Sequence, residues 1–472
     1  MSAEWPLKKL SEVAEFLNYK RVPLKSLDRE KRQGNYPYYG ASGVVDHIDD
    51  FIFDGTFLLI SEDGENLRTR KTPIAFKAIG KFWVNNHAHI LAEKEEGILD
   101  YLEYYFAKLD LSPFITGAVQ PKLNKANLDS IAIPIPPREE RLKINRIFNS
   151  FTNKIELNRQ TNQTLEQIAQ AIFKSWFIEF EPTRAKIAAK NRWQAIHQTT
   201  ECGSPTCYAE EFDTEQQDQN IKATSLEEAM TQAAMAAISG KALSQLSQHS
   251  PEQQQQLKAT ADLFPGDLVD SPLGEVPEGW DIKPLDQIAH YQNGLAMQKF
   301  RPDNDNEFLP VLKIAQFKKG YVDGGEKASP YIKSECIVNN GDVIFSWSAS
   351  LLVDMWCGGK VALNQHLFKV TSVKHPKWFY LYWTKYHLEL FKKIAADKAV
   401  TMGHIKRSHL SEAQCAVPNT DLADFSLIGS LVDKQVEQRL ESFSLMAIRD
   451  SMLPKLLSGE LPIHEAQQQI KQ

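Results

Sequence analysis

The feature that most constrains how this 472-residue chain can fold is an internal repeat. Trp5–Leu10 is echoed by Trp280–Leu285, and Val84–His87 is echoed by Leu363–His366. Further matches keep a separation of about 280 residues along the whole chain. Chance similarity does not hold one offset across several separate motifs, so the sequence encodes two copies of one unit.

Each copy consists of a globular part followed by a long helical pattern. Short apolar runs bounded by Gly, Asp and Asn, such as Phe57–Ile60 and Val343–Phe345, are typical of strands. Asp100–Leu109 and Trp378–Phe391 have the aromatic and aliphatic spacing of a helix on each sheet. The expected fold class is therefore α+β, with two mixed α/β domains separated by long helices and related by a pseudo-two-fold repeat.

The first long helix, predicted over Glu139–Phe177, has the most regular pattern in the sequence. Its seam residues alternate four and three positions apart, which is a heptad period and implies a partner helix. Asn158 and Asn162 interrupt the apolar seam, and such residues can fix the register of a helix pair. The second long helix, about Leu422–Leu457, has a looser seam. Each helix could pack on its own domain, but two equal helices more simply pair antiparallel as a coiled coil. The predicted seam and partner-binding residues are Phe148, Phe151, Ile155, Asn158, Asn162, Leu165, Ile172 and Trp176, with Leu431, Leu445, Met452 and Leu456.

The distribution of charge decides whether a nucleic acid is a plausible partner. The net charge of −6 does not favour one by itself. Between residues 187 and 270, however, five basic residues stand against twelve acidic ones, a net of −7, which leaves +1 for the rest of the chain. Short basic clusters would then suffice for contact with DNA. The acidic stretch itself is predicted to be a polar linker with one or two short helices.

Sequence motifs for catalysis are missing. There is no G-x-x-x-x-G-K-[ST] phosphate loop, no Gly-rich nucleotide turn and no Asn-Pro-Pro-aromatic sequence of an amino-methyltransferase. Histidines do not pair at metal-binding spacing, and no carboxylate–lysine cluster suggests a nuclease. The chain is therefore expected to be non-catalytic, with no metal or cofactor of its own.

The cysteines and the apolar runs indicate a cytoplasmic protein. The five cysteines are scattered, as expected for thiols in a reducing compartment. Cys202 and Cys207 are close enough to consider as a metal pair, but no second pair or His cluster accompanies them. No run approaches the roughly 18 apolar residues of a membrane span, and Met1–Lys9 is not a signal peptide.

Several clusters of side chains suit contact with DNA. A basic cluster at 68–71 follows a Gly-containing turn, and Arg and Lys can bind phosphates or reach the guanine edge. For any one basic residue the alternative is a solvated surface charge, and for Tyr38 and Tyr39 it is packing. His87 and His366, in matching positions, are predicted to be structural residues at a strand start. The candidate DNA-binding residues are Tyr38, Tyr39, Arg68, Arg70, Lys71, Lys122, Lys125, Lys313, Lys318, Lys319, His404, Lys406 and Arg407.

Five stretches resemble one known family, the specificity subunits of type I restriction–modification systems. Leu165–Phe180 resembles the end of the family's central conserved helix, and Asp270–Trp280 resembles the usual entry to the second recognition domain. Met452–Leu461 resembles the C-terminal conserved region, while Pro37–Gly43 and Trp83–His87 are similar to stretches of the recognition domains. The resemblance covers nearly the whole chain. The long insert at 187–256 departs from it, because the family does not require one.

The resemblance implies a protein that binds double-stranded DNA through two target recognition domains. Each would read one half of a split, asymmetric sequence, and the paired helices would set the spacing between the halves. It also implies two methyltransferase (M) subunits docked on the helices and adjoining surfaces, and two motor-nuclease (R) subunits in the full complex. S-adenosylmethionine, ATP and magnesium would belong to those partners. The implied domains are target recognition domain 1 at 1–136, a central conserved helix at 137–182, a polar linker at 183–270, target recognition domain 2 at 271–418, a C-terminal conserved helix at 419–461 and a tail at 462–472.

Two other classes of protein remain to be separated from this one. A self-contained methyltransferase or nuclease is disfavoured by the missing motifs. A coiled-coil scaffold whose lobes bind protein would show no salt-sensitive binding to DNA, because counterion release makes true DNA binding strongly dependent on salt.

Overall fold

The computed structural model gives the fold of most of the chain. Cys202 and Cys207 lie outside the part that it describes, so the idea of a metal pair there is not addressed. The described residues are 5–201, 223–304, 306–397 and 403–471.

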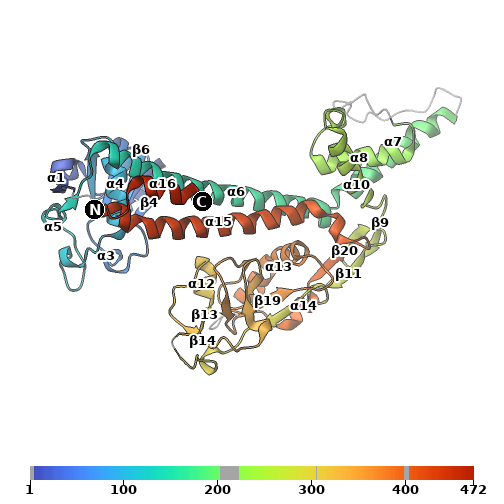
Figure 1. The fold of residues 1–472 in the computed structure, drawn as a ribbon. Helices are drawn as coiled ribbons and strands as arrows, with labels where there is room; N and C mark the ends of the chain where they lie inside the picture. The colour runs from blue at the N-terminus through green and yellow to red at the C-terminus, as the bar shows by residue number, and fades with distance from the viewer. Residues whose placement is uncertain (1–4, 202–222, 305, 398–402, 472) are drawn as a thin grey trace. The chain divides into compact units, whose positions relative to one another are not determined.

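The chain divides into two compact units, each with one globular domain and part of both long helices (Figure 1). Unit 1 consists of Met1–Leu157 and Ser442–Gln472, and unit 2 of Asn158–Glu441. The long helices are α6 (Arg138–Phe177) and α15 (Ser426–Leu457). Both agree with the predicted helices, except that the first residues predicted for the second one form a short 3₁₀ turn instead.

The first domain is built on one six-stranded sheet with the order β2-β7-β5-β6-β3-β4. In the antiparallel pair of β5 and β6, Gly55 faces Gly80, and both glycines have a positive φ that other residues rarely adopt. Helix α4 (Ile98–Lys108) covers the sheet and buries Ile98, Tyr101 and Leu102 in the domain core. The strands are β2 (Ala14–Phe16), β3 (Gln33–Gly40), β4 (Gly43–Ile48), β5 (Phe53–Ser61), β6 (Ala75–Val84) and β7 (Ala88–Glu93).

Most strands of the second domain form two four-stranded sheets, and β11 (Asp281–Pro284) pairs with β20 (Gln414–Val417) in a separate two-stranded sheet. One four-stranded sheet has the order β12-β19-β16-β17 and the other β14-β13-β18-β15. Helix α13 (Lys377–Asp397) contributes Phe379, Leu381 and Trp383 to the core. The strands are β12 (His290–Asn293), β13 (Leu309–Leu312), β14 (Lys327–Ala328), β15 (Ile337–Val338), β16 (Val343–Ser346), β17 (Leu352–Met355), β18 (Val361–Leu363) and β19 (Leu367–Thr371).

The two domains have the same topology, which confirms the repeat. The order β2-β7-β5-β6 corresponds to β12-β19-β16-β17, and β4-β3-β6-β5 corresponds to β14-β13-β18-β15. Each domain has one parallel strand pair at the matching place, β3 with β6 and β13 with β18. The continuous strands β5 and β6 of the first domain are each represented by two shorter strands in the second. The difference in sheet number is therefore a break in two strands and not a different fold.

The seam predicted for α6 faces α15 in both units. In unit 1, Phe148 and Phe151 share a buried cluster with Met452 and Leu456 of α15. In unit 2, the Asn158 amide donates to Glu441 at 2.7 Å, while the Trp176 ring lies 6.0 Å from that of Phe425, the residue directly before α15. Because the residue number rises along one helix as it falls along the other, these helix segments run antiparallel. All twelve predicted seam residues are buried or half-buried, as expected if this face of each helix is covered.

The segment between the domains contains more helix than predicted. Where one or two short helices were expected, the described residues form α7 (Glu181–Glu201), α8 (Leu226–Ser239), α9 (Leu243–Leu246) and α10 (Pro251–Asp262). Serine caps begin two of them, and Ala234, Met235, Leu246 and Ala261 bury one another. The alanine-rich helix α8 supplies two of these four residues, and the small core explains why the polar composition of the segment was misleading.

Candidate nucleic-acid interface

One arrangement of chain segments occurs in both domains, where the strand β5 or β16 ends. In the first domain, Leu123 N donates to Glu62 O at 2.7 Å, and Gly64 N donates to Pro121 O at 3.0 Å. In the second domain, Ile405 N donates to Trp347 O at 3.1 Å, and Ala349 N donates to Gly403 O at 2.9 Å. The same backbone ladder therefore joins the end of a central strand to a distant loop in each half.

Side chains complete this arrangement, and we refer to it as the junction of each domain. The first junction consists of Glu62, Asp63, His87, His89 and Lys122. The second junction has Trp347, Ser348, His366, Phe368 and His404 at the equivalent positions.

The histidines of the two junctions are held in the same way. An asparagine two residues earlier accepts a hydrogen bond from the backbone N–H of each, at 2.8 Å for His87 and 3.2 Å for His366. The His87 ring then pairs through Nδ1 with Asp63 at 2.8 Å, and the His366 ring pairs through Nδ1 with the Ser348 hydroxyl at 3.2 Å. Both lie directly before a strand, as predicted. The sequence did not show that their rings also take part in a junction.

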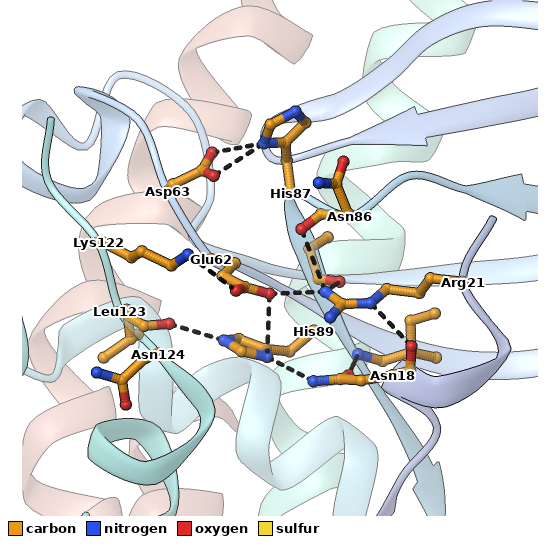
Figure 2. A network of polar contacts seen from close by, with 12 residues as sticks. Asn18, Arg21, Glu62, Asp63, Asn86, His87, His89, Lys122, Leu123 and Asn124 are labelled. Carbon is orange, nitrogen blue, oxygen red and sulfur yellow. Dashed lines mark hydrogen bonds and ion pairs between the residues drawn. The ribbon is translucent and has the colours of Figure 1, made fainter. Parts of the chain in front are cut away.

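The interior of the first junction is a polar network (Figure 2). The Arg21 guanidinium lies 2.6 Å from the Glu62 carboxylate and donates to Ala88 O at 2.8 Å. Lys122 Nζ approaches the same carboxylate at 3.7 Å. Glu62 is thus a half-buried acceptor shared by two cations that come from different parts of the chain.

His89 forms the floor of this network and is only 1% exposed. Its Nε2 lies 2.7 Å from Leu123 O, and its Nδ1 lies 2.8 Å from the Asn18 amide nitrogen. These partners fit a neutral ring that donates through Nε2 and accepts through Nδ1. Burial lowers the pKa of His89 below its ordinary value, although the Glu62 carboxylate opposes that shift.

The interior of the second junction is aromatic. The Trp347 ring lies 5.7 Å from Phe368, 6.0 Å from His366 and 6.3 Å from His404. The Arg407 guanidinium lies over the Phe368 ring at 5.4 Å and donates to a strand carbonyl, that of Tyr291, at 3.1 Å. Aromatic contacts here occupy the place that ion pairs and hydrogen bonds fill in the first domain.

The structure brings two predicted basic residues of the first domain to one loop. Arg68 donates to Gly117 O at 2.8 Å and to Ala118 O at 3.2 Å, and so holds the loop that leads to Lys122. Both side chains are about half exposed. Lys71 is exposed three residues after Arg68. Lys125, at the position equivalent to Arg407, lies over the Phe16 ring at 4.9 Å.

The other residues of the first domain that were predicted to contact DNA make hydrogen bonds or packing contacts within the domain. Arg70 has a φ of +47° and donates to Ala107 O at 3.2 Å, so its guanidinium caps the end of α4. Tyr38 is 1% exposed and its hydroxyl accepts a hydrogen bond from Leu24 N at 2.9 Å. Tyr39 is half-buried against the Phe76 and Phe82 rings. The Arg70 guanidinium and the Tyr38 hydroxyl are thus engaged by backbone groups of the domain, and both tyrosines pack within it.

The predicted basic residues of the second domain lie in two places. Lys313, Lys318 and Lys319 belong to or adjoin α12 (Ile314–Lys319), where Lys313 pairs with Glu326 and Lys319 lies 3.0 Å from Asp323. Lys318 is exposed, as are His404, Lys406 and Arg407 around the second junction. Of the residues predicted there, His404 occupies the position equivalent to Lys122.

Sequence reasoning missed the residues that build the junction interiors. They are Asn18, Arg21, Glu62, His89, Trp347 and Phe368. The repeat could have pointed to these residues, because Glu62 and Trp347 follow corresponding strands. A glutamate aligned with a tryptophan, however, is not recognisable as a match between the two copies.

The described ranges contain no group of three or more His, Cys, Asp or Glu residues arranged to hold a metal ion. Among the helices of those ranges, none combines the length and apolar character needed to cross a membrane.

Comparison with known proteins gives matches to one family. A family model described as the type I restriction modification DNA specificity domain matches residues 2–167 and 277–437. The chain is 28% identical over 363 residues to the type I restriction enzyme HindI specificity subunit of Haemophilus influenzae, covering 72% of this chain and 71% of that protein. It is 22% identical over a 496-residue alignment to the MjaIX specificity subunit of Methanocaldococcus jannaschii, covering 98% of this chain and 94% of that protein. A solved type I restriction–modification S subunit from M. genitalium has a TM-score of 0.49 at 11% identity, with 96% of each chain covered.

Proposed function

The chain belongs to the family of type I restriction–modification DNA specificity proteins, and from this premise we propose that it reads a two-part, asymmetric DNA sequence. Each globular domain reads one half of the target. The chain itself performs no catalysis and directs the methylation and cleavage that partner subunits carry out.

One observation supports a two-part and asymmetric target above all others. The two domains have the same strand order and the same backbone contacts at their junctions, but Lys122 and Asp63 of the first junction are replaced by His404 and Ser348 in the second. Two domains with the same backbone scaffold would each read one half-site, and different side chains on that scaffold would read different bases. Identical junctions would instead suit a palindrome.

The long helices are proposed to set the number of unread base pairs between the half-sites. Helix α6 has 40 residues, which corresponds to a length of about 60 Å. Half-sites one turn of B-DNA apart are about 34 Å apart, so helices of this length can span the distance. The paired seam gives them the stiffness that a spacer needs.

The partners are proposed on family membership. Two methyltransferase subunits would dock on the helices and the adjoining domain surfaces, and two motor-nuclease subunits would join the full complex in the cytoplasm. S-adenosylmethionine, ATP and magnesium would be bound by those subunits. The absence of the corresponding motifs from this sequence supports that division of labour.

The test is a map of modified adenines. The chain is co-expressed with the methyltransferase subunit of its system in a host without DNA methylation, and the genome is sequenced by a method that detects the modified base. A split motif with a fixed gap, lost when this chain is omitted, is the expected result. A stable complex of the two proteins that methylates no motif would contradict the proposal and favour the scaffold.

The spacer role has a separate test. Four residues inserted near Asn158 would lengthen α6 by about 6 Å. The gap of the methylated motif is then expected to change, or methylation to be lost. An unchanged gap in a folded variant would show that the helices do not set the spacing.

A further inference from the structure

We propose that the two junctions are the places where each domain contacts the bases of its half-site. Positions 63, 87 and 122 would act in the first domain, and positions 366 and 404 in the second, where the buried Ser348 holds the His366 ring. This inference rests on the proposed function. It assigns DNA-reading roles to His87 and His366, which the sequence predicted to be structural residues at a strand start.

The exposure of these side chains favours contact with a ligand. The side chains of His87 and Lys122 are 46% and 53% exposed, and Asp63 between them is 17% exposed. His404 is exposed and His366 is half-buried in the second domain. Figure 2 shows His87 and Asp63 pointing to the rim of the first junction, while His89 lies at its floor. Ser348 is only 6% exposed, so the reachable outer positions are 63, 87, 122, 366 and 404, and the inner residues support them.

The hydrogen bonds prepare the outer side chains for base recognition. Because Asp63 engages Nδ1 of His87, the neutral ring has its proton there and Nε2 is left as an acceptor. An acceptor in that place suits the amino group of adenine or cytosine in the major groove. Lys122 offers a donor that suits the N7 and O6 acceptors of guanine. Groups already held in position lose less conformational freedom on binding.

The second junction presents a different set of groups on the same frame. The Ser348 hydroxyl faces Nδ1 of His366, and the Gln365 amide nitrogen lies 3.3 Å from Nε2 of that ring. An imidazole, that of His404, stands where the first domain has the Lys122 ammonium. The backbone hydrogen bonds are kept, whereas four of the five junction side chains change in kind and only the histidine at 87 and 366 is shared. Such variation is what a duplicated domain needs in order to read a second, different half-site.

The experiment uses the complex of this chain with its methyltransferase subunit and the motif found in the methylation map. Lys122→Ala and His404→Ala are compared with the wild type for binding to the target and to duplexes that carry one base change in either half. Lys122→Ala should reduce discrimination about tenfold at a position in one half-site. His404→Ala should reduce discrimination in the other half-site only.

Lys94→Ala is the matched control. Lys94 is an exposed lysine of the same domain that donates to a backbone carbonyl, and it follows the far end of β7, about 20 Å from the strand start beside His87. It should leave discrimination unchanged. Lys122→Gln and His404→Gln, which keep side-chain length, repeat the measurement if either alanine variant has a lowered unfolding midpoint.

Three results would overturn the inference and leave the proposed function standing, provided that the wild type still methylates a split motif. The first is unchanged discrimination in both variants. The second is an equal loss of affinity for target and altered DNA, which indicates contact with phosphates alone. The third is an effect of both variants on the same half-site.

Discussion

The two junctions have the same backbone hydrogen bonds but opposite interiors. In the first, Arg21, Glu62 and His89 form a polar network with 1–16% exposure of each side chain. In the second, Trp347 and Phe368 take the positions of Glu62 and His89 and pack ring against ring. The comparison shows that the backbone hydrogen bonds define the shape of the junction, because the same bonds form around a polar interior and around an aromatic one.

The two interiors are expected to differ in how they respond to change. A buried charged network is costly to desolvate, and removing one member leaves the others without a partner. An aromatic interior has no such dependence, because each contact adds a little and none needs a particular partner. The first junction should therefore be the more easily broken of the two.

The largest effect is expected from removal of the Glu62 carboxylate. Glu62→Ala leaves the half-buried Arg21 guanidinium without its counter-charge, and should lower the free energy of unfolding of the first domain by about 3 kcal/mol. Amide hydrogen exchange along β5 and β7 measures this, with strands β16 and β19 of the same molecule as the internal reference. A loss under 1 kcal/mol would mean that the network contributes little to the free energy of unfolding, and that the two junctions differ in their side chains but not in their stability.

The next largest effect is expected from a lower pH, which should destabilise the first junction through protonation of His89. His89 is buried with a pKa below its ordinary value of 6.5, so the stability that depends on its neutral form is full above about pH 6.5 and falls as the pH drops. The second domain also buries a histidine, His387, with its pKa lowered to about 4 by burial, which should cost that domain about 2 kcal/mol at pH 5. However, His387 bonds to Gln414 O, not to the second junction, where Phe368 replaces His89.

The measurement is exchange of two amides, Leu123 N–H and Ile405 N–H, which close the two junctions. From pH 7 to pH 5, after correction for intrinsic rates, protection of Leu123 should fall because of His89. His387→Phe should restore acid resistance to the second domain and leave the behaviour of Leu123 as it was. Equal protection of Leu123 at both pH values would show that His89 protonates without loosening the first junction.

Trimming the aromatic interior should have a smaller effect than breaking the polar one. Trp347→Leu loses the ring contacts to Phe368 and His366 but keeps an apolar side chain, so a loss of about 1.5 kcal/mol is expected in the second domain. Urea denaturation followed by exchange at β16 gives the value. If this loss exceeds that of Glu62→Ala, the aromatic interior is the less tolerant one and the order proposed above is reversed.

The smallest effects concern the cations at the equivalent positions Lys125 and Arg407. Arg407→Ala removes a cation from the Phe368 ring and a hydrogen bond to Tyr291 O, for about 1 kcal/mol. Lys125→Ala removes only the contact with the Phe16 ring, for about 0.5 kcal/mol. Both are measured by the unfolding midpoint in urea. Equal values would indicate that the extra hydrogen bond of Arg407 adds nothing.

Much of the architecture was predictable from the sequence because it depends on regular spacing. The constant offset between the two halves predicted two domains of one fold, and the alternation along α6 predicted the helix pair that α15 completes. A helix of 40 residues repeats its pattern many times, so that its buried face is visible without any knowledge of the partner. The same reasoning fell short in the insert, where a small core formed by four residues carries too little pattern to detect.

The candidate site was decided by tertiary structure. Sequence pointed to Lys122 and His404, but it could not show that Arg70 turns to cap α4 or that Tyr38 is buried, because both depend on segments distant along the chain. The hydrogen bond between Leu123 and Glu62 joins residues that no local pattern connects. Periodicity and repetition record what each segment buries, whereas a site made of loop ends exists only after folding has brought them together.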